Sequence, residues 1–179
     1  MRIISGKYKG RHIRPPANFR ARPTTDFARE SLFNIIGNTF DFEDLHIMDL
    51  FAGTGSIGLE FASRGAGKVE MVEKNYIHSE FIRRTLKSLD TGNARVIKSD
   101  VFRYLNKASG VYDIIFADPP YDLPEFEKVP LRILDHKNLL KQDGWFILEH
   151  SKQYTFESLP GFFDHRNYGS VNFSFFQSE

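Results

Sequence analysis

The sequence contains no cysteine among its 179 residues. Disulfides, cysteine-ligated zinc and thiol nucleophiles are therefore excluded, and this absence fits a cytoplasmic protein. No apolar run reaches about 18 residues, so we expect no transmembrane helix and no membrane partner. The basic N-terminus lacks the apolar segment of a signal peptide. The six histidines are scattered without metal-ligand spacing, so no metal is assigned.

What is present is a globular composition with an uneven distribution of charge. Apolar residues make up 41% of the chain, which suggests one domain with a sizeable core. Residues 1–30 hold eight basic and two acidic side chains, a net charge of +6, so the rest must carry −5 to give the overall +1. A basic arm on a mildly acidic body favours a polyanionic partner, nucleic acid first.

From residue 45 onward, strand and helix patterns alternate. Strands are expected at 46–51, 68–74, 94–99, 112–117 and 144–150, and helices at 56–64, 76–89, 101–107 and 126–140. Near-continuous apolar strands between helices indicate a parallel sheet covered on both faces. Residues 161–177 instead alternate apolar and polar side chains around Tyr168-Gly169-Ser170, which predicts an antiparallel hairpin.

The first part of the chain reads as an extension of this domain. Residues 2–14 predict a short β-hairpin with turns at Gly6 and Gly10. Thr24 or Thr25 can then cap a helix that ends before Gly37. We therefore divide the chain into a basic arm, residues 1–24, and a main domain, residues 25–179.

A glycine-rich turn follows the first strand of the alternation. Gly53, Gly55 and Gly58 fit the pattern G-x-G-x-x-G between a strand and a helix. There, glycines let the backbone turn sharply and approach a ligand closely. The pattern itself does not choose between NAD, FAD and S-adenosylmethionine.

Acids at the strand ends favour a cationic ligand. The first four strands end in Asp49, Glu73, Asp100 and Asp118. Ligands of open α/β sheets bind beyond these ends, where the acids would repel a pyrophosphate and suit the sulfonium and ammonium groups of S-adenosylmethionine. Glu73 can accept both ribose hydroxyls, Asp100 the adenine amino group, and Asp49 can orient the loop and the methionine end.

Residues 116–121 read FADPPY, a stiff extended corner at the end of the fourth strand. The fourth strand should lie beside the first, so this corner should face the sulfonium methyl group. The exocyclic amine of a nucleobase must pyramidalise before it can attack. The Asp118 carboxylate and the Pro119 carbonyl can accept its two N–H groups, and Tyr121 can stack on the base. A base inside a helix would have to be flipped out.

Several motifs together resemble one family over nearly the full chain. They are MRIISGKYKGRHI, RPTTDFARESLFNII, DLFAGTGSIGLE, SRGA, DPPY and RNYG. In this order they are similar to the RsmD family, bacterial enzymes that methylate the N2 amine of one guanine in 16S rRNA within the assembling 30S subunit. The resemblance implies a Rossmann-like class I methyltransferase fold, with a mostly parallel seven-stranded sheet, a C-terminal antiparallel hairpin and helices on both faces. It also implies S-adenosyl-L-methionine as cofactor and S-adenosyl-L-homocysteine as product.

The motifs and the resemblance together predict three groups of site residues. The catalytic group is Asp118, Pro119, Pro120 and Tyr121. The cofactor-binding group is Thr24, Asp49, Phe51, Gly53, Gly55, Glu73, Lys74, Asp100, Val101 and Phe102. The RNA-binding group is Lys7, Lys9, Arg11, Arg14, Arg20, Arg22 and Arg29, with Tyr8 and Phe19 available for stacking. Arg166, Tyr168 and Gly169 match a terminal signature whose role stays open.

Other functions stay open at this point. D-P-P-Y serves the N6 amine of adenine in DNA equally well, although the chain has no evident target-recognition domain. A non-catalytic RNA-binding assembly factor on the same scaffold is a second alternative, and an NAD-linked oxidoreductase is the weakest. The sequence does not identify the modified nucleotide or decide between naked RNA and an assembled subunit, and nothing in it requires more than a monomer.

Overall fold

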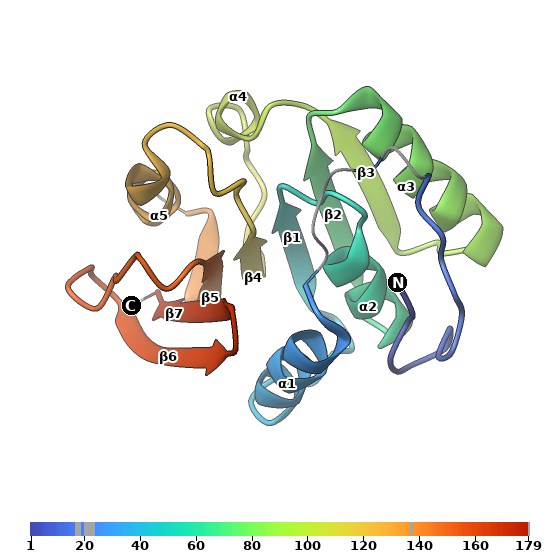
Figure 1. The fold of residues 1–179 in the computed structure, drawn as a ribbon, viewed down its shortest axis with the longest axis horizontal. Coiled ribbons are helices and arrows are strands. Elements are labelled where there is room, and N and C mark those ends of the chain that lie inside the picture. The colour runs from blue at the N-terminus through green and yellow to red at the C-terminus, as the bar shows by residue number, and fades with distance from the viewer. Residues whose placement is uncertain (17–18, 20–23, 137, 179) are drawn as a thin grey trace.

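Seven strands form one sheet in the computed structural model, which describes residues 1–16, 19, 24–136 and 138–178 (Figure 1). The strands are β1 His46–Leu50, β2 Lys68–Glu73, β3 Ala94–Lys98, β4 Tyr112–Ala117, β5 Leu140–His150, β6 Phe162–Tyr168 and β7 Val171–Gln177. Their order is β3-β2-β1-β4-β5-β7-β6. The first five strands pair in parallel, while β7 is antiparallel to both β5 and β6. The mostly parallel sheet with a C-terminal hairpin is confirmed, and so is the pairing of β4 with β1.

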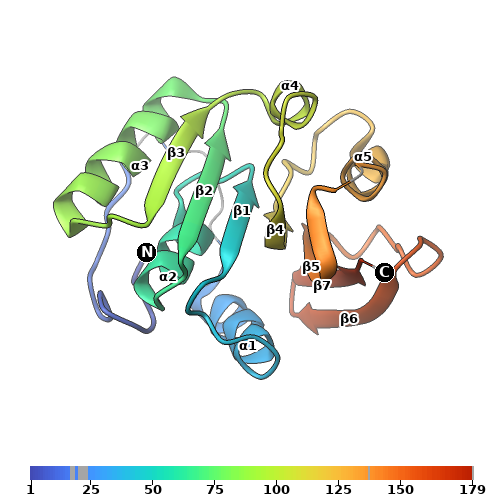
Figure 2. The same ribbon diagram turned by 180° about the vertical axis from the view of Figure 1, so that it is seen from behind.

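Helices cover both faces of the sheet, as the two opposite views show (Figures 1 and 2). They are α1 Asp26–Gly37, α2 Ser56–Ser63, α3 Tyr76–Leu89, α4 Val101–Leu105, the 3-10 turn η1 Phe126–Lys128 and α5 Val129–Leu134. Side chains of α1, α2 and α3 share one apolar core with one face of the sheet. Side chains of α4, η1 and α5 share a second core with the other face. Within the described ranges, no helix has the length and apolar character needed to cross a membrane.

Side-chain caps fix where the longer helices begin. The Asn75 side chain accepts from the N–H groups of Ile77 and His78 at the start of α3. The Thr25 hydroxyl accepts from Ala28 N–H at 3.2 Å at the start of α1, so Thr25 rather than Thr24 is the cap. Such caps satisfy the N–H groups that a first helical turn leaves without partners.

The helix expected at 126–140 is shorter than predicted. Its first turn is the 3-10 segment η1, and the α-helix α5 extends only from Val129 to Leu134. Pro130 lies in the first turn of α5, where its missing N–H is tolerated but cannot continue a helix begun at Phe126. Asn138 then has a φ of 65°, and β5 begins at Leu140. The prediction of one long helix was therefore wrong.

The N-terminal hairpin is minimal and is held against α2. It has one antiparallel bridge, between Arg2 and His12. The buried carboxylate of Glu60 accepts from Ile4 N–H and Ser5 N–H at 2.8 and 2.9 Å. A Cβ atom on Gly6 would lie only 1.8 Å from the Ser63 carbonyl oxygen. The hairpin therefore depends on close backbone contact with α2.

Candidate active site

The turn between β1 and α2 has an unusual backbone. Phe51, Gly53 and Gly55 have positive φ angles of 62°, 54° and 75°. Glycine enters this left-handed region without strain, whereas phenylalanine does not. Phe51 also lines the cavity that the turn encloses. Strained backbone of this kind clusters at functional sites, so the turn is a candidate ligand-binding element.

Gly58 allows α2 to lie close to the sheet. A Cβ atom there would lie 2.5 Å from Met71 Sδ and 3.2 Å from Asp49 Oδ2. Because no Cβ is present, Gly58 N–H donates to Asp49 Oδ2 at 3.0 Å. Asp49 thus ties the end of β1 to the first turns of α2, a contact that its predicted role of orienting the loop requires.

A cavity of about 690 Å³ lies at the carboxyl ends of the central strands. All four residues of the Asp118–Tyr121 corner line it. So do nine of the ten residues predicted to bind the cofactor: Thr24, Asp49, Phe51, Gly53, Glu73, Lys74, Asp100, Val101 and Phe102. Gly55 does not line it, and a Cβ atom there would lie 3.1 Å from the Ile82 side chain. The glycine loop and the proline corner, more than 60 residues apart in sequence, therefore share one cavity.

Two acids at the β2 and β3 ends organise one side of the cavity. Glu73 accepts from Gly53 N–H at 2.8 Å and from Asn75 N–H at 2.7 Å. Asp100 caps α4, and its Oδ2 lies 3.1 Å from Lys74 Nζ. Partial burial alone would raise the pKa of Asp100, but the hydrogen bond and charge of Lys74 lower it overall. Asp100 is thus held ionised at the cavity edge, where it can accept further hydrogen bonds.

Three carboxyl groups converge on another wall of the cavity. Asp49, Asp118 and Glu149 come from β1, from the residue after β4, and from β5. Burial raises the pKa of Asp49 and of Glu149 to about 7, against the Gly58 and Thr24 hydrogen bonds that lower it. Burial and the charges of Glu149 and Asp49 raise the pKa of Asp118 well above its usual range. A bound cation would relieve this repulsion and favour all three carboxylates.

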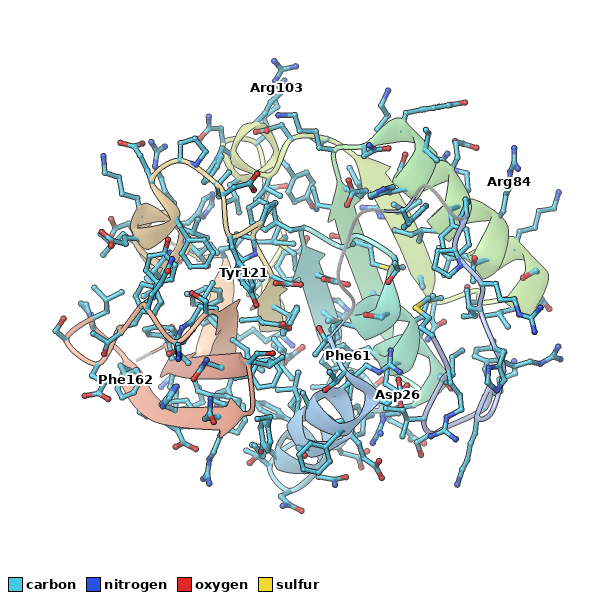
Figure 3. The ribbon with its side chains drawn as sticks, viewed as in Figure 1. Asp26, Phe61, Arg84, Arg103, Tyr121 and Phe162 are labelled. Carbon is cyan, nitrogen blue, oxygen red and sulfur yellow. The ribbon has the colours of Figure 1, made fainter. Side chains whose placement is uncertain are left out.

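The proline corner presents its groups at the end of β4. The N–H of Asp118 donates to Leu50 O at 3.4 Å, which holds the corner against β1. Pro119 is buried, whereas Tyr121 is 45% exposed and lies near the centre of the view in Figure 3. Asp118 and Tyr121 both line the cavity, and the exposed Tyr121 ring offers a surface on which a planar group could stack.

The basic residues predicted to bind RNA occupy different situations. Lys7, Lys9, Arg11 and Arg14 are exposed on the N-terminal hairpin, whereas Arg20 and Arg22 lie outside the described residues. Arg29 is only 1% exposed, and its guanidinium donates to Arg2 O and to Asp26. A direct RNA contact by Arg29 was therefore a wrong prediction, since the side chain instead joins α1 to the hairpin.

The aromatic side chains expected to stack on RNA also differ in their surroundings. The Phe19 ring stacks on His78, with ring centroids 3.9 Å apart, and contacts Phe81 edge-on. Tyr8 is partly buried against the core of α1, α2 and α3. Both rings thus already have protein partners.

Glu149 is the one residue of the carboxyl wall that the sequence interpretation missed. The signal was available, because the fifth strand ends in Glu149-His150 just as the first four end in acids. Its Oε2 accepts from the Thr24 hydroxyl at 2.8 Å. Within the described ranges, no group of three or more His, Asp or Glu side chains is arranged to hold a metal ion.

Comparisons with known proteins agree with this architecture. A family model described as "Conserved hypothetical protein 95" matches residues 1–177. Ribosomal RNA small subunit methyltransferase D of Escherichia coli is 35% identical over 149 residues, covering 83% of this chain and 71% of that protein. A solved Thermus thermophilus structure, hypothetical protein TTHA0928, superposes with a TM-score of 0.88 and 26% identity, covering 99% of both chains.

A more distant structure shares the fold alone. It is the 16S rRNA N2 G1207 methyltransferase RsmC of T. thermophilus, solved with AdoMet and guanosine. Its TM-score is 0.72 at 20% identity, over 89% of this chain and 45% of that one.

Proposed function

The chain belongs to the family described as Conserved hypothetical protein 95, the RsmD family, and from this we propose that it methylates 16S rRNA. The reaction transfers a methyl group from S-adenosyl-L-methionine to the exocyclic N2 amine of one guanine. One observation carries the proposal: the Asp118–Tyr121 corner and the strained glycine loop line the same cavity.

The residues around the cavity fit S-adenosyl-L-methionine. Glu73 and Asp100 supply carboxylate acceptors for the ribose and adenine, with Val101 and Phe102 beside them. The carboxyl wall of Asp49, Asp118 and Glu149 suits a ligand with two positive groups and would oppose a pyrophosphate. When bound, this cofactor supplies a methyl group on a positively charged sulfur, which becomes the neutral thioether of S-adenosyl-L-homocysteine.

The protein contributes positioning and electrostatic stabilisation to the transfer. The Asp118 carboxylate and the Pro119 carbonyl accept the two N–H groups of the guanine amine, which favours the pyramidal nitrogen. The nitrogen lone pair forms the new N–C bond while the S–C electron pair stays on sulfur. Asp118 then accepts the proton that the positively charged nitrogen loses, and Tyr121 stacks on the base.

The exposed cations of the N-terminal hairpin fit an RNA partner. Lys7, Lys9, Arg11 and Arg14 can follow backbone phosphates, and they extend a surface rather than enter the cavity. We assign these four cations to binding of the assembling 30S subunit. Residues 1–24 then form an RNA-binding arm, and residues 25–179 form the methyltransferase domain. The protein then acts in the cytoplasm, as a monomer.

The proposal is tested with labelled S-adenosyl-L-methionine and three substrates: unmethylated 30S subunits, naked 16S rRNA and DNA. Nucleoside analysis should show N2-methylguanosine. Asp118→Ala should lower turnover by about 100- to 1000-fold while RNA binding persists. Asp41→Asn, an exposed acid between α1 and β1, serves as the control and should keep full activity.

Each negative result has a distinct meaning. N6-methyladenine as the product would replace this function with adenine methylation. Unreduced methylation by the Asp118→Ala variant would remove the proline corner from the chemistry. No transfer to any substrate, with RNA binding retained, would favour an assembly factor.

A further inference from the structure

Glu149 is a buried acid of the carboxyl wall to which the transfer chemistry assigns no contact with the base. It is 3% exposed, it lies next to the end of β5, and it lines the same cavity as the proline corner. A buried carboxylate is costly unless hydrogen bonds or charges compensate for the loss of water. Its position beside Asp118 therefore calls for a partner in the cavity.

The strand register brings Glu149 close to Asp118. Ala117 of β4 is paired with Leu148 of β5, and these strands run in parallel. Asp118 directly follows the end of β4, and Glu149 follows Leu148 in β5, so the two acids come at neighbouring positions just after this last pair of the ladder. The contribution of Glu149 to the raised pKa of Asp118 is consistent with this proximity.

The Thr24 hydroxyl fixes the Glu149 carboxylate. It donates to Glu149 Oε2 at 2.8 Å from the segment that precedes α1, and both side chains are buried. A carboxylate held in this way is a rigid acceptor with a defined direction. The cavity thus offers two carboxylates side by side, one at the proline corner and one fixed by Thr24.

The Watson–Crick edge of guanine presents hydrogen-bond donors that the carboxylates of Asp118 and Glu149 can accept. Guanine carries its N1–H donor next to its N2 amine, whereas adenine has an acceptor at N1. An ionised carboxylate only accepts hydrogen bonds, so it suits the guanine edge and opposes the adenine edge. Extruded bases are commonly recognised through hydrogen bonds to this edge.

We propose that Glu149 is a specificity-determining residue that accepts a hydrogen bond from the N1–H of the target guanine while the N2 amine lies at Asp118 and Pro119. The inference rests on the proposed function and adds the means of base selection. Thr24 is then a positioning residue, because it acts on the base only through Glu149.

The test uses 2-aminopurine, which keeps the 2-amine of guanine but has an acceptor at N1. The guanine that the wild type methylates is replaced by 2-aminopurine in 16S rRNA assembled into 30S particles, and rates are measured at pH 8. The wild type should prefer guanine by about 10- to 100-fold, as expected for hydrogen bonds to charged groups. Glu149→Gln can donate its amide to N1, so the preference should fall at least 10-fold.

A second readout does not depend on turnover. The fluorescence of 2-aminopurine reports its unstacking, and its titration gives the affinity of each variant for the substituted RNA. For each protein we compare the affinity for 2-aminopurine RNA with the affinity for guanine RNA. This ratio should be at least 10-fold higher in Glu149→Gln than in the wild type. Glu43→Gln, an exposed acid before β1, is the matched control and should keep the wild-type ratio.

The outcomes separate this inference from the proposed function. Equal loss of guanine and 2-aminopurine methylation in Glu149→Gln would show a structural role only and overturn the inference. If the wild type methylates no guanine, the proposed function itself fails. Should Glu149→Gln not fold, Thr24→Val serves in its place, and an unchanged guanine preference in that variant would also overturn the inference.

Discussion

Replacing Asp49 by asparagine tests whether the carboxyl wall opposes folding. Asp49 is 2% exposed, and its pKa is raised from 3.8 to about 7, chiefly by burial. Asparagine has nearly the same size and can still accept from Gly58 N–H. The substitution therefore removes the ionisable group while leaving the contact between β1 and α2 in place.

The sign and size of the effect follow from the direction of the pKa shift. The folded state binds the Asp49 proton more tightly than the unfolded state, so stability decreases as the pH rises from about 4 to about 7. The full shift corresponds to at most about 4 kcal/mol above pH 7, at about 1.4 kcal/mol per pH unit. The asparagine variant lacks this pH dependence of stability. Its neutral amide oxygen accepts a hydrogen bond that is weaker by about 1 kcal/mol than that of a carboxylate.

We therefore expect the free energy of unfolding of Asp49→Asn, relative to that of the wild type, to increase by about 2 to 3 kcal/mol as the pH rises from 5 to 8. For a chain of this size the difference in melting temperature should change by roughly 4 to 12 °C. Urea unfolding at pH 5, 6.5 and 8 measures the difference, with Asp41→Asn as the exposed control. The variant should also bind S-adenosyl-L-methionine more weakly at pH 8. A stability difference that does not vary with pH would refute the reasoning.

Two further predictions concern the N-terminal hairpin. Gly6→Ala should lower the free energy of unfolding by at least about 1 kcal/mol more than Gly10→Ala, because both have φ near 80° but only the Gly6 Cβ would meet the Ser63 carbonyl, at 1.8 Å. Equal losses of unfolding free energy in the two variants would show that backbone strain, and not the contact with α2, accounts for the destabilisation. The double variant Lys9→Glu, Arg11→Glu should weaken 30S binding and reduce its salt dependence while S-adenosyl-L-methionine binding stays intact. Unchanged 30S binding would remove the hairpin from the RNA interface.

The sequence predicted the elements whose signals are local. The helix expected at 76–89 agrees with both bounds of α3. The apolar runs and the glycine-rich turn were enough to identify the parallel strands and the edge where the cavity forms. Gly169, with a φ of 69°, marks the turn of the terminal hairpin as expected.

The errors arose where a residue's role depends on distant parts of the chain. Arg29 looked like another cation of the basic arm, but the partner that explains its burial is the carbonyl of Arg2, 27 residues away. Glu149 carried a local signal as an acid at the end of the fifth strand, but its contact with Thr24, 125 residues away, is contained in no local pattern. The prediction of one helix over 126–140 was wrong for another reason, because that range did not take account of Pro130, which lies in the first turn of α5.

The arrangement of acids links the stability of the protein to its proposed chemistry. Parallel pairing of β4 with both β1 and β5 brings Asp49, Asp118 and Glu149 to one wall, where burial raises the pKa of all three and the charges of Glu149 and Asp49 raise that of Asp118 further. In the proposed reaction Asp118 must be ionised to accept the guanine amine and its proton. A positively charged sulfur beside the wall favours that ionised form, and methyl transfer removes this charge. The wall is therefore most complementary to the loaded cofactor, and it loses part of its attraction for the ligand once the methyl group has moved, which favours replacement of the product by a fresh cofactor.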